Sequence, residues 1–163
     1  MVRHVFFSFH YERDVWRANQ VRNSWVTKPN TEAAGFIDKA AFEEVKKKGD
    51  AAVEKWIDDQ LNGTSVTVVL IGAETSTRKY VQYEIKKSHG KNGMLGIYIH
   101  KQKDQDGKTD SKGANPFDFF YITNSDGSTI YLSALYPTYD WINDNGYANL
   151  GKWIEAAAKK AGK

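Results

Sequence analysis

The chain contains no cysteine, and only three of its 163 residues are proline. The absence of cysteine excludes disulfide bonds, thiolate metal ligands and a cysteine nucleophile. No apolar segment approaches the roughly 20 residues that a helix needs to span a bilayer. The first apolar run, residues 5–9, is too short for a signal peptide and leads directly into charged residues. We therefore expect a soluble, cytoplasmic protein that does not bind membranes.

The charges are nearly balanced, with 23 basic and 20 acidic residues and a net charge of +3. The basic residues are scattered in short clusters, whereas nucleic-acid-binding proteins usually concentrate them on one face. This distribution favours solvated helix surfaces and predicts no nucleic-acid partner. Aromatic residues make up 13% of the chain, including five Trp and nine Tyr, enough to form both a core and an aromatic ligand site.

The order of apolar patterns predicts one α/β domain over residues 1–163. "SVTVVLIG" (Ser65–Gly72) is β-branched and almost wholly apolar, which is typical of a central parallel strand covered on both faces. We expect strands at residues 5–9, 65–72 and 94–100, and helices at residues 14–26, 50–61, 75–88 and 147–160. Asp50 is the expected N-cap of its helix. Residues 28–35 are rich in turn formers and precede a brief "FID" at residues 36–38. Residues 101–115 are expected to form a solvated loop, and residues 117–134 a hairpin or an irregular edge.

Several common site types are missing from this pattern. The chain has no GxGxxG, GxxxxGK[ST] or GxSxG motif, which argues against dinucleotide-fold, P-loop and serine-hydrolase sites. The end of the first strand also lacks the acidic residues of a phospho-acceptor receiver domain. Four scattered histidines make no zinc pattern, and residues 103–110 lack the spacing of a calcium loop. We therefore expect no metal site.

Two distant stretches should meet at one edge of the sheet. Ligands of open α/β sheets bind beyond the carboxyl ends of the strands, where the strand order reverses. In the flavodoxin-like order, this point lies between the first and third strands. The first strand ends in Ser8, Phe9, His10 and Tyr11, and the third ends in "GAETST", which includes Ser76. These residues are candidates for a ligand crevice.

The segment "RKYVQYEIKKS" (Arg78–Ser88) follows this crevice and carries a single carboxylate, Glu84. Tyr80 lies four residues earlier, so the two side chains share one side of the predicted helix. The spacing alone favours an ordinary solvated position for Glu84, paired with Lys87 in water. Tyr80 could equally be core, and Ser8 merely a small residue at a strand end.

A resemblance to a known family favours a functional role for Glu84 over a solvated one. The segments "RHVFFSFHYERDVWRANQVRNSWV", "GFIDKAAFEEVKK", "NGTSVTVVLIGAETSTRKYVQYEIKKS" and "SKGANPFDFF" together resemble the TIR-like family of bacterial antiphage defence, most closely the TIR subunit of the Thoeris system. The resemblance spans nearly the whole chain. It implies a flavodoxin-like TIR fold with a mostly parallel sheet covered by helices on both faces. It also implies cleavage of NAD+, which is a substrate rather than a cofactor, and a nucleotide signal that activates an effector protein. A phage-derived trigger and a homo-oligomer are compatible with it.

The resemblance assigns the catalytic carboxylate to Glu84. The family carries Trp where this chain has Tyr80, and Tyr keeps an aromatic face for stacking. One carboxylate is chemically sufficient: ordinary glycosidases use two because an alkoxide leaving group must be protonated, whereas nicotinamide departs neutral. The carboxylate then stabilises an oxocarbenium-like ribose. The alternative is a non-enzymatic TIR module that acts by docking, which has no need of an acid in this position.

The same resemblance suggests roles for the opposite wall of the crevice. Phe9 and Tyr11 could stack on nicotinamide or adenine, while Ser8 and His10 could reach ribose or phosphate. Asp38 corresponds to the region of the TIR loop that gates the pocket. Each of these residues also has a purely structural interpretation, either as a strand end packed on the first helix or as a turn residue.

Overall fold

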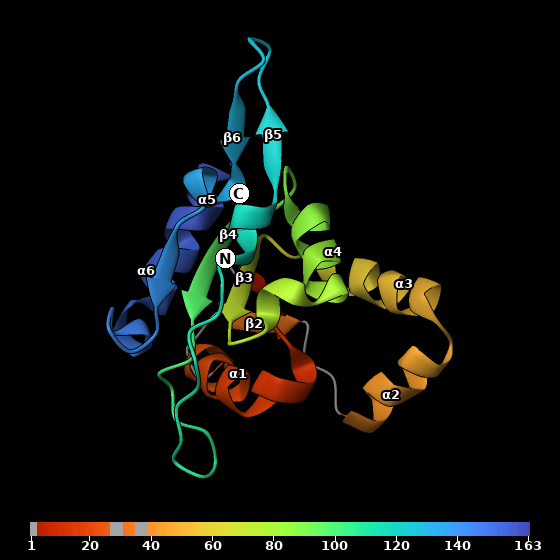
Figure 1. Cartoon of the computed structure of the whole chain (residues 1–163), viewed down its shortest axis with the longest axis vertical. Coiled ribbons are helices and arrows are strands. Elements are labelled where there is room, and N and C mark those ends of the chain that lie inside the picture. The colour runs from red at the N-terminus through yellow and green to blue at the C-terminus, as the bar shows by residue number, and fades with distance from the viewer. Residues whose placement is uncertain (1–2, 27–30, 35–38) are drawn as a thin grey trace.

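A five-stranded parallel sheet forms the centre of the computed structural model, which describes residues 3–26, 31–34 and 39–163 (Figure 1). The sheet consists of β2 (Thr31–Ala34), β1 (Arg3–Ser8), β3 (Val66–Ile71), β4 (Gly93–Tyr98) and β7 (Thr138–Asp140), in that spatial order. All four pairings between neighbouring strands are parallel. β2 lies on one side of β1, and β3 lies on its other side. The direction in which successive strands are added therefore reverses between β1 and β3. The predicted flavodoxin-like arrangement is confirmed.

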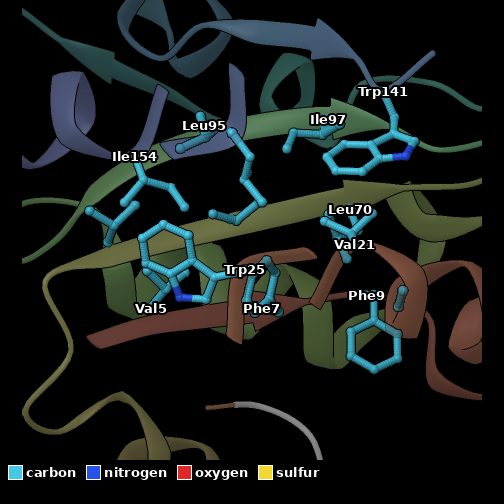
Figure 2. Packing of buried hydrophobic residues seen from close by; sticks show 14 of the residues in the cluster. Val5, Phe7, Phe9, Val21, Trp25, Leu70, Leu95, Ile97, Trp141 and Ile154 are labelled. Atoms are coloured by element: carbon cyan, nitrogen blue, oxygen red, sulfur yellow. The ribbon is translucent and has the colours of Figure 1, made fainter. Parts of the chain in front are cut away.

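Helices cover both faces of the sheet. They are α1 (Tyr11–Val26), α2 (Lys39–Lys47), α3 (Asp50–Leu61), α4 (Lys79–Ser88), the single-turn α5 (Leu132–Leu135) and α6 (Gly146–Lys160). α1 and α6 pack on one face, where Val5, Phe7, Trp25 and Ile154 share a core (Figure 2). On the other face, Phe6 packs against apolar residues of α3. Successive side chains of a strand point to opposite faces, so Ser8 lies on the same face as Phe6, toward α3 and α4.

Two strands, β2 and β7, and two helices, α2 and the single-turn α5, were not predicted. β2 occupies residues 31–34 of the stretch that is rich in turn formers, and it pairs with β1 from Arg3 opposite Thr31 to Phe6 opposite Ala34. β7 is three residues long and pairs with β4, and α2 was not anticipated. The predicted hairpin is confirmed as β5 (Tyr121–Thr123) and β6 (Thr129–Tyr131), which project from the body of the domain (Figure 1). The "FID" segment at residues 36–38 lies outside the described residues.

One predicted helix start and one predicted N-cap differ in the structure. α1 begins at Tyr11 rather than at Asp14. The backbone N–H of Asp14 already donates a helical hydrogen bond to the carbonyl of His10. The predicted N-cap at Asp50 is wrong. Gly49, whose φ of 97° suits glycine, occupies that position, and Asp50 is the first helical residue. Its carboxylate instead accepts hydrogen bonds from Lys79 and Tyr80 of α4.

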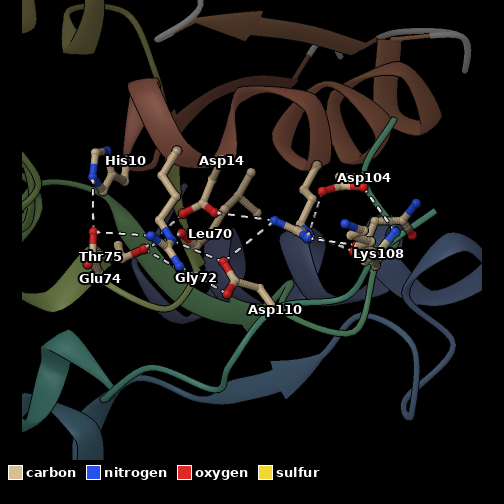
Figure 3. Close-up of polar contacts among 12 residues, drawn as sticks. His10, Asp14, Leu70, Gly72, Glu74, Thr75, Asp104, Lys108 and Asp110 are labelled. Atoms are coloured by element: carbon tan, nitrogen blue, oxygen red, sulfur yellow. Dashed lines mark hydrogen bonds and ion pairs between the residues drawn. The ribbon is translucent and has the colours of Figure 1, made fainter. Parts of the chain in front are cut away.

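The loop at residues 101–115 is irregular, as predicted, but it is not simply solvated. The buried guanidinium of Arg17 donates to the carbonyls of Gln102 at 2.7 Å and Lys108 at 2.8 Å. Arg13 forms a two-pronged pair with Asp110, at 3.0 Å for both contacts (Figure 3). α1 therefore holds this loop against the carboxyl end of the sheet. None of the helices in the described part of the chain is long and apolar enough to cross a membrane.

Candidate active site

The carboxyl group of Glu84 faces the end of β1. Ser8 Oγ donates a hydrogen bond to Glu84 Oε1 at 3.2 Å, across 76 residues of sequence. Ser8 is completely buried, and only 6% of the Glu84 surface is exposed. The interpretation of Glu84 as a solvated helix residue is therefore wrong. α4 turns this side chain toward the strand because Val81 and Ile85 on the same side pack into the apolar core.

Burial is the main influence on the acidity of Glu84. Removal from water disfavours the charged form and raises the pKa of this carboxyl well above its usual value, while the hydrogen bond from Ser8 opposes that shift. No cation balances the carboxyl among the groups that shift this pKa. Burial thus shifts the balance toward the neutral acid, and a cation placed beside Glu84 would shift it back toward the carboxylate.

Glu84 opens into a cavity of about 620 Å³, a volume that includes space continuous with solvent. Its apolar walls come from β1, α3 and α4 and include Phe7, Phe9, Val53, Ile57 and Val81. Its charged residues are Glu12, Lys46 and Arg78. The acid thus lies among apolar groups, with cations also lining the cavity.

The end of β1 and the start of α1 form one aromatic wall. Phe9 and Tyr11 line the cavity with ring centroids 6.0 Å apart and planes tilted by 34°. His10 lies between them and is buried. Burial lowers the pKa of His10, and the positive charge of Arg78 lowers it further. His10 is therefore a neutral hydrogen-bonding group near pH 7 rather than a fixed cation.

Tyr80 has two roles in the structure. Its ring lines the cavity together with Glu84, as the spacing of four residues predicts. Its hydroxyl donates to Asp50 Oδ1 at 2.6 Å, which ties α4 to the start of α3. The ring also packs beside the core cluster that contains Phe6 and Val53. Tyr80 is therefore a wall of the cavity and a structural tie at the same time.

Ser76, a predicted site residue of the described chain, does not line this cavity. Ser76 is buried, its carbonyl accepts a hydrogen bond from Gln82 Nε2 at 2.9 Å, and it is absent from the described residues that line the cavity. Asp38 lies outside the described residues. In the parts of the chain that the structure describes, no group of three or more His, Asp or Glu side chains is placed to hold a metal ion.

Several cavity residues were not recognised from the sequence as parts of a site, among them Trp56, Lys46 and Arg78. Trp56 lines the cavity from α3, where its spacing in an apolar stripe indicated only a core position. Lys46 comes from α2, a helix that was not predicted. Arg78 directly precedes α4, and its position two residues before Tyr80 was the one local signal that could have placed it near the site.

Comparisons with known proteins identify the family of this chain. A family model described as "Thoeris protein ThsB, TIR-like domain" matches residues 6–104. A protein of Bacillus cereus (strain MSX-D12) with the name "Putative cyclic ADP-D-ribose synthase ThsB1" is 39% identical over 191 aligned positions, covering 94% of this chain and 100% of that protein. The family match and the parallel sheet covered by helices together identify a TIR-like domain. More narrowly, the chain belongs to the family of ThsB proteins of the Thoeris system.

Proposed function

We propose that this protein breaks the nicotinamide–ribose bond of NAD+ and converts the ADP-ribosyl part into a cyclic nucleotide signal of a Thoeris antiphage system. The observation that carries the proposal is the buried Ser8–Glu84 pair, which opens into a cavity with aromatic walls. The name of the B. cereus relative, a cyclic ADP-D-ribose synthase, supports cyclisation rather than simple hydrolysis.

Glu84 would act on the bond through its charge. The positive nicotinamide ring and its ribose favour the ionised carboxylate when they enter the cavity, because an opposite charge offsets the cost of burial. As the C1′–N bond breaks, its electron pair leaves with nicotinamide, and positive charge develops on the ribose. The carboxylate stabilises this charge, and no acid is needed for the neutral leaving group.

The second half of the reaction needs an acceptor and a destination for its proton. In cyclisation, a hydroxyl or ring nitrogen of the same ADP-ribosyl unit bonds to C1′. If the acceptor is a hydroxyl, its proton is released, and the Glu84 carboxylate is placed to receive it. The apolar walls formed by Phe9, Val53 and Ile57 restrict water near the acid, which favours an internal acceptor.

The test is to incubate purified protein with NAD+ and to follow nicotinamide and nucleotide products by mass spectrometry. Parallel reactions contain lysate from phage-infected cells, because a defence enzyme can require a trigger. Glu84→Gln should abolish nicotinamide release. Glu54→Gln, which changes an exposed glutamate of the neighbouring helix α3, should retain it.

Two results would contradict the proposal. Nicotinamide release at the wild-type rate by Glu84→Gln would remove the catalytic assignment. Absence of products from the wild-type protein, with and without lysate and also in infected cells that express it, would favour a TIR module that acts by docking.

The wider system is part of the same proposal. The nucleotide signal would activate a separate effector protein, and a phage-derived component would trigger its synthesis. A cytoplasmic location fits both the substrate and the infection. A homo-oligomer could complete the cavity, and its presence can be tested by measuring the mass of the protein in solution with and without NAD+.

A further inference from the structure

Arg78 lines the same cavity as Glu84 but belongs to its exposed rim. It is the N-cap residue of α4, in extended backbone conformation, and its side chain is exposed. Its guanidinium forms no hydrogen bond or ion pair with any residue that the structure describes. Its charge nevertheless reaches into the site, where it lowers the pKa of His10 and that of Glu12.

The other cations around the site are already paired. Lys46 also lines the cavity, but its Nζ lies 3.0 Å from Glu12 Oε1. On the other side of α1, Arg13 is bound to Asp110, and Arg17 to carbonyls of the loop at residues 101–115. Within the described part of the chain, Arg78 is therefore the cation of the cavity whose charge has no partner.

The charge pattern of the cavity matches that of a dinucleotide. NAD+ has a positive ring at one end, a ribose, and then a pyrophosphate with two negative charges. The cavity has an acid at Glu84 and an unpaired cation at Arg78. Arg78 directly precedes α4, and Glu84 lies in its second turn, so the cation and the acid are separated along the cavity by more than one turn of helix. A guanidinium also matches the geometry of phosphate oxygens through paired hydrogen bonds.

We propose that Arg78 binds the pyrophosphate of the substrate and thereby sets its direction, with the nicotinamide ring toward Glu84 and the phosphates at the rim. The assignment rests on the proposed function, because it takes NAD+ as the substrate. It adds a selection rule: the site requires a phosphorylated nicotinamide compound, and nicotinamide riboside, which lacks phosphate, gains nothing from Arg78.

Binding measurements in the Glu84→Gln background can test this without turnover. Calorimetry would measure the affinity for NAD+ and for nicotinamide riboside in this parent protein and in three variants of it: Arg78→Gln, Arg78→Lys and Lys152→Gln. Lys152 is an exposed residue of α6 and serves as the charge-matched control. Thermal unfolding of each variant checks that the fold is retained.

We expect Arg78→Gln to weaken NAD+ binding by about 10- to 100-fold, the loss that charge-assisted hydrogen bonds predict. Arg78→Lys should restore part of the affinity, because it keeps the charge but not the paired geometry. Riboside binding should change less than about twofold, since no phosphate is present. Added salt should weaken NAD+ binding more in the protein with Arg78 than in Arg78→Gln.

Other results would overturn the assignment. Equal NAD+ affinities in Arg78→Gln and Lys152→Gln would show that Arg78 does not bind the pyrophosphate. An equal loss for NAD+ and the riboside would show that Arg78 shapes the nicotinamide end of the cavity instead. If the parent protein binds neither compound, the proposed function itself fails, and the role of Arg78 fails with it.

Discussion

Ser8 Oγ and Glu84 Oε1 lie 3.2 Å apart and join the end of β1 to the middle of α4. Both residues are buried, and the hydrogen bond opposes the rise in the pKa of Glu84 that burial causes. A neutral hydroxyl can stabilise the carboxylate without cancelling its charge. The pair therefore keeps Glu84 available for a cationic substrate while favouring the ionised form that the proposed reaction needs.

Replacing Ser8 with Ala should slow the reaction and change its pH dependence. Loss of the hydrogen bond leaves burial unopposed, so the pKa of Glu84 rises further. We expect kcat to fall by about 10-fold, equivalent to one charge-assisted hydrogen bond. The acidic limb of the kcat–pH profile should move to higher pH. Ser24→Ala, which removes a hydroxyl bound to the carbonyl of Val21 in α1, is the control. An unmoved acidic limb in Ser8→Ala would contradict the role of this pair.

Truncation of Tyr80 should affect both stability and substrate binding. Tyr80→Ala removes a cavity wall and the hydrogen bond to Asp50. Tyr83→Ala is the matched control, because the Tyr83 hydroxyl donates to Asp58 of the same helix α3 at 2.8 Å without lining the cavity. Both variants should be less stable by about 1–3 kcal/mol. Only Tyr80→Ala should also raise the KM for NAD+, and an equal KM in the two variants would place the Tyr80 ring outside the substrate site.

Tyr80→Trp should keep the reaction. The larger ring preserves an aromatic face beside Glu84, but it loses the hydroxyl that binds Asp50. We expect nicotinamide release to be retained and the free energy of unfolding to fall by about 0.5–1.5 kcal/mol, the value of one hydrogen bond. Both quantities should be measured on one preparation. A stable but inactive Tyr80→Trp would exclude stacking of this ring on the substrate.

Arg17 and Arg13 should differ greatly in their contributions to stability. Arg17→Ala leaves the carbonyls of Gln102 and Lys108 without their donor and removes a cation from beside the buried Asp14. We expect a loss of about 3 kcal/mol or more in urea unfolding, together with faster proteolysis within residues 101–115. Arg13→Ala removes an ion pair whose arginine side chain is 40% exposed and should cost less than about 1 kcal/mol. Equal losses would show that the loop is not held through Arg17.

Asp14 should make the protein more stable at mildly acidic pH. Burial raises the pKa of this fully buried carboxyl from 3.8 to about 6. The folded state therefore holds the proton more tightly than the unfolded state, and the resulting stability is lost as pH rises through about 6. Relative to Asp14→Asn, the wild-type protein should gain about 1–2 kcal/mol between pH 8 and pH 5. Urea unfolding at the two pH values measures this difference, and a difference independent of pH would contradict the shifted pKa.

The strongest local patterns predicted the framework correctly. The β-branched run of β3 and the apolar residues of β1 and β4 are buried, and such apolar runs can be recognised as strands from the local sequence. β2 and β7 carry the short sequences "TEAA" and "TYD", which have no apolar run. They become strands because β1 and β4 offer unpaired backbone groups at the sheet edges.

The candidate site also has features that the sequence indicated and features that only the tertiary structure decided. The sequence by itself, through the resemblance of "RKYVQYE" to its family, indicated Glu84 as the candidate catalytic carboxyl. The spacing of four residues also indicated that Tyr80 shares its side of the helix. Only the tertiary structure decided that Glu84 is buried, that Ser8 is its partner and that Arg78 is an unpaired cation within the described chain. The physical reason is that burial, pKa and charge pairing depend on side chains from β1, α1, α2 and α3, which no local pattern in α4 contains.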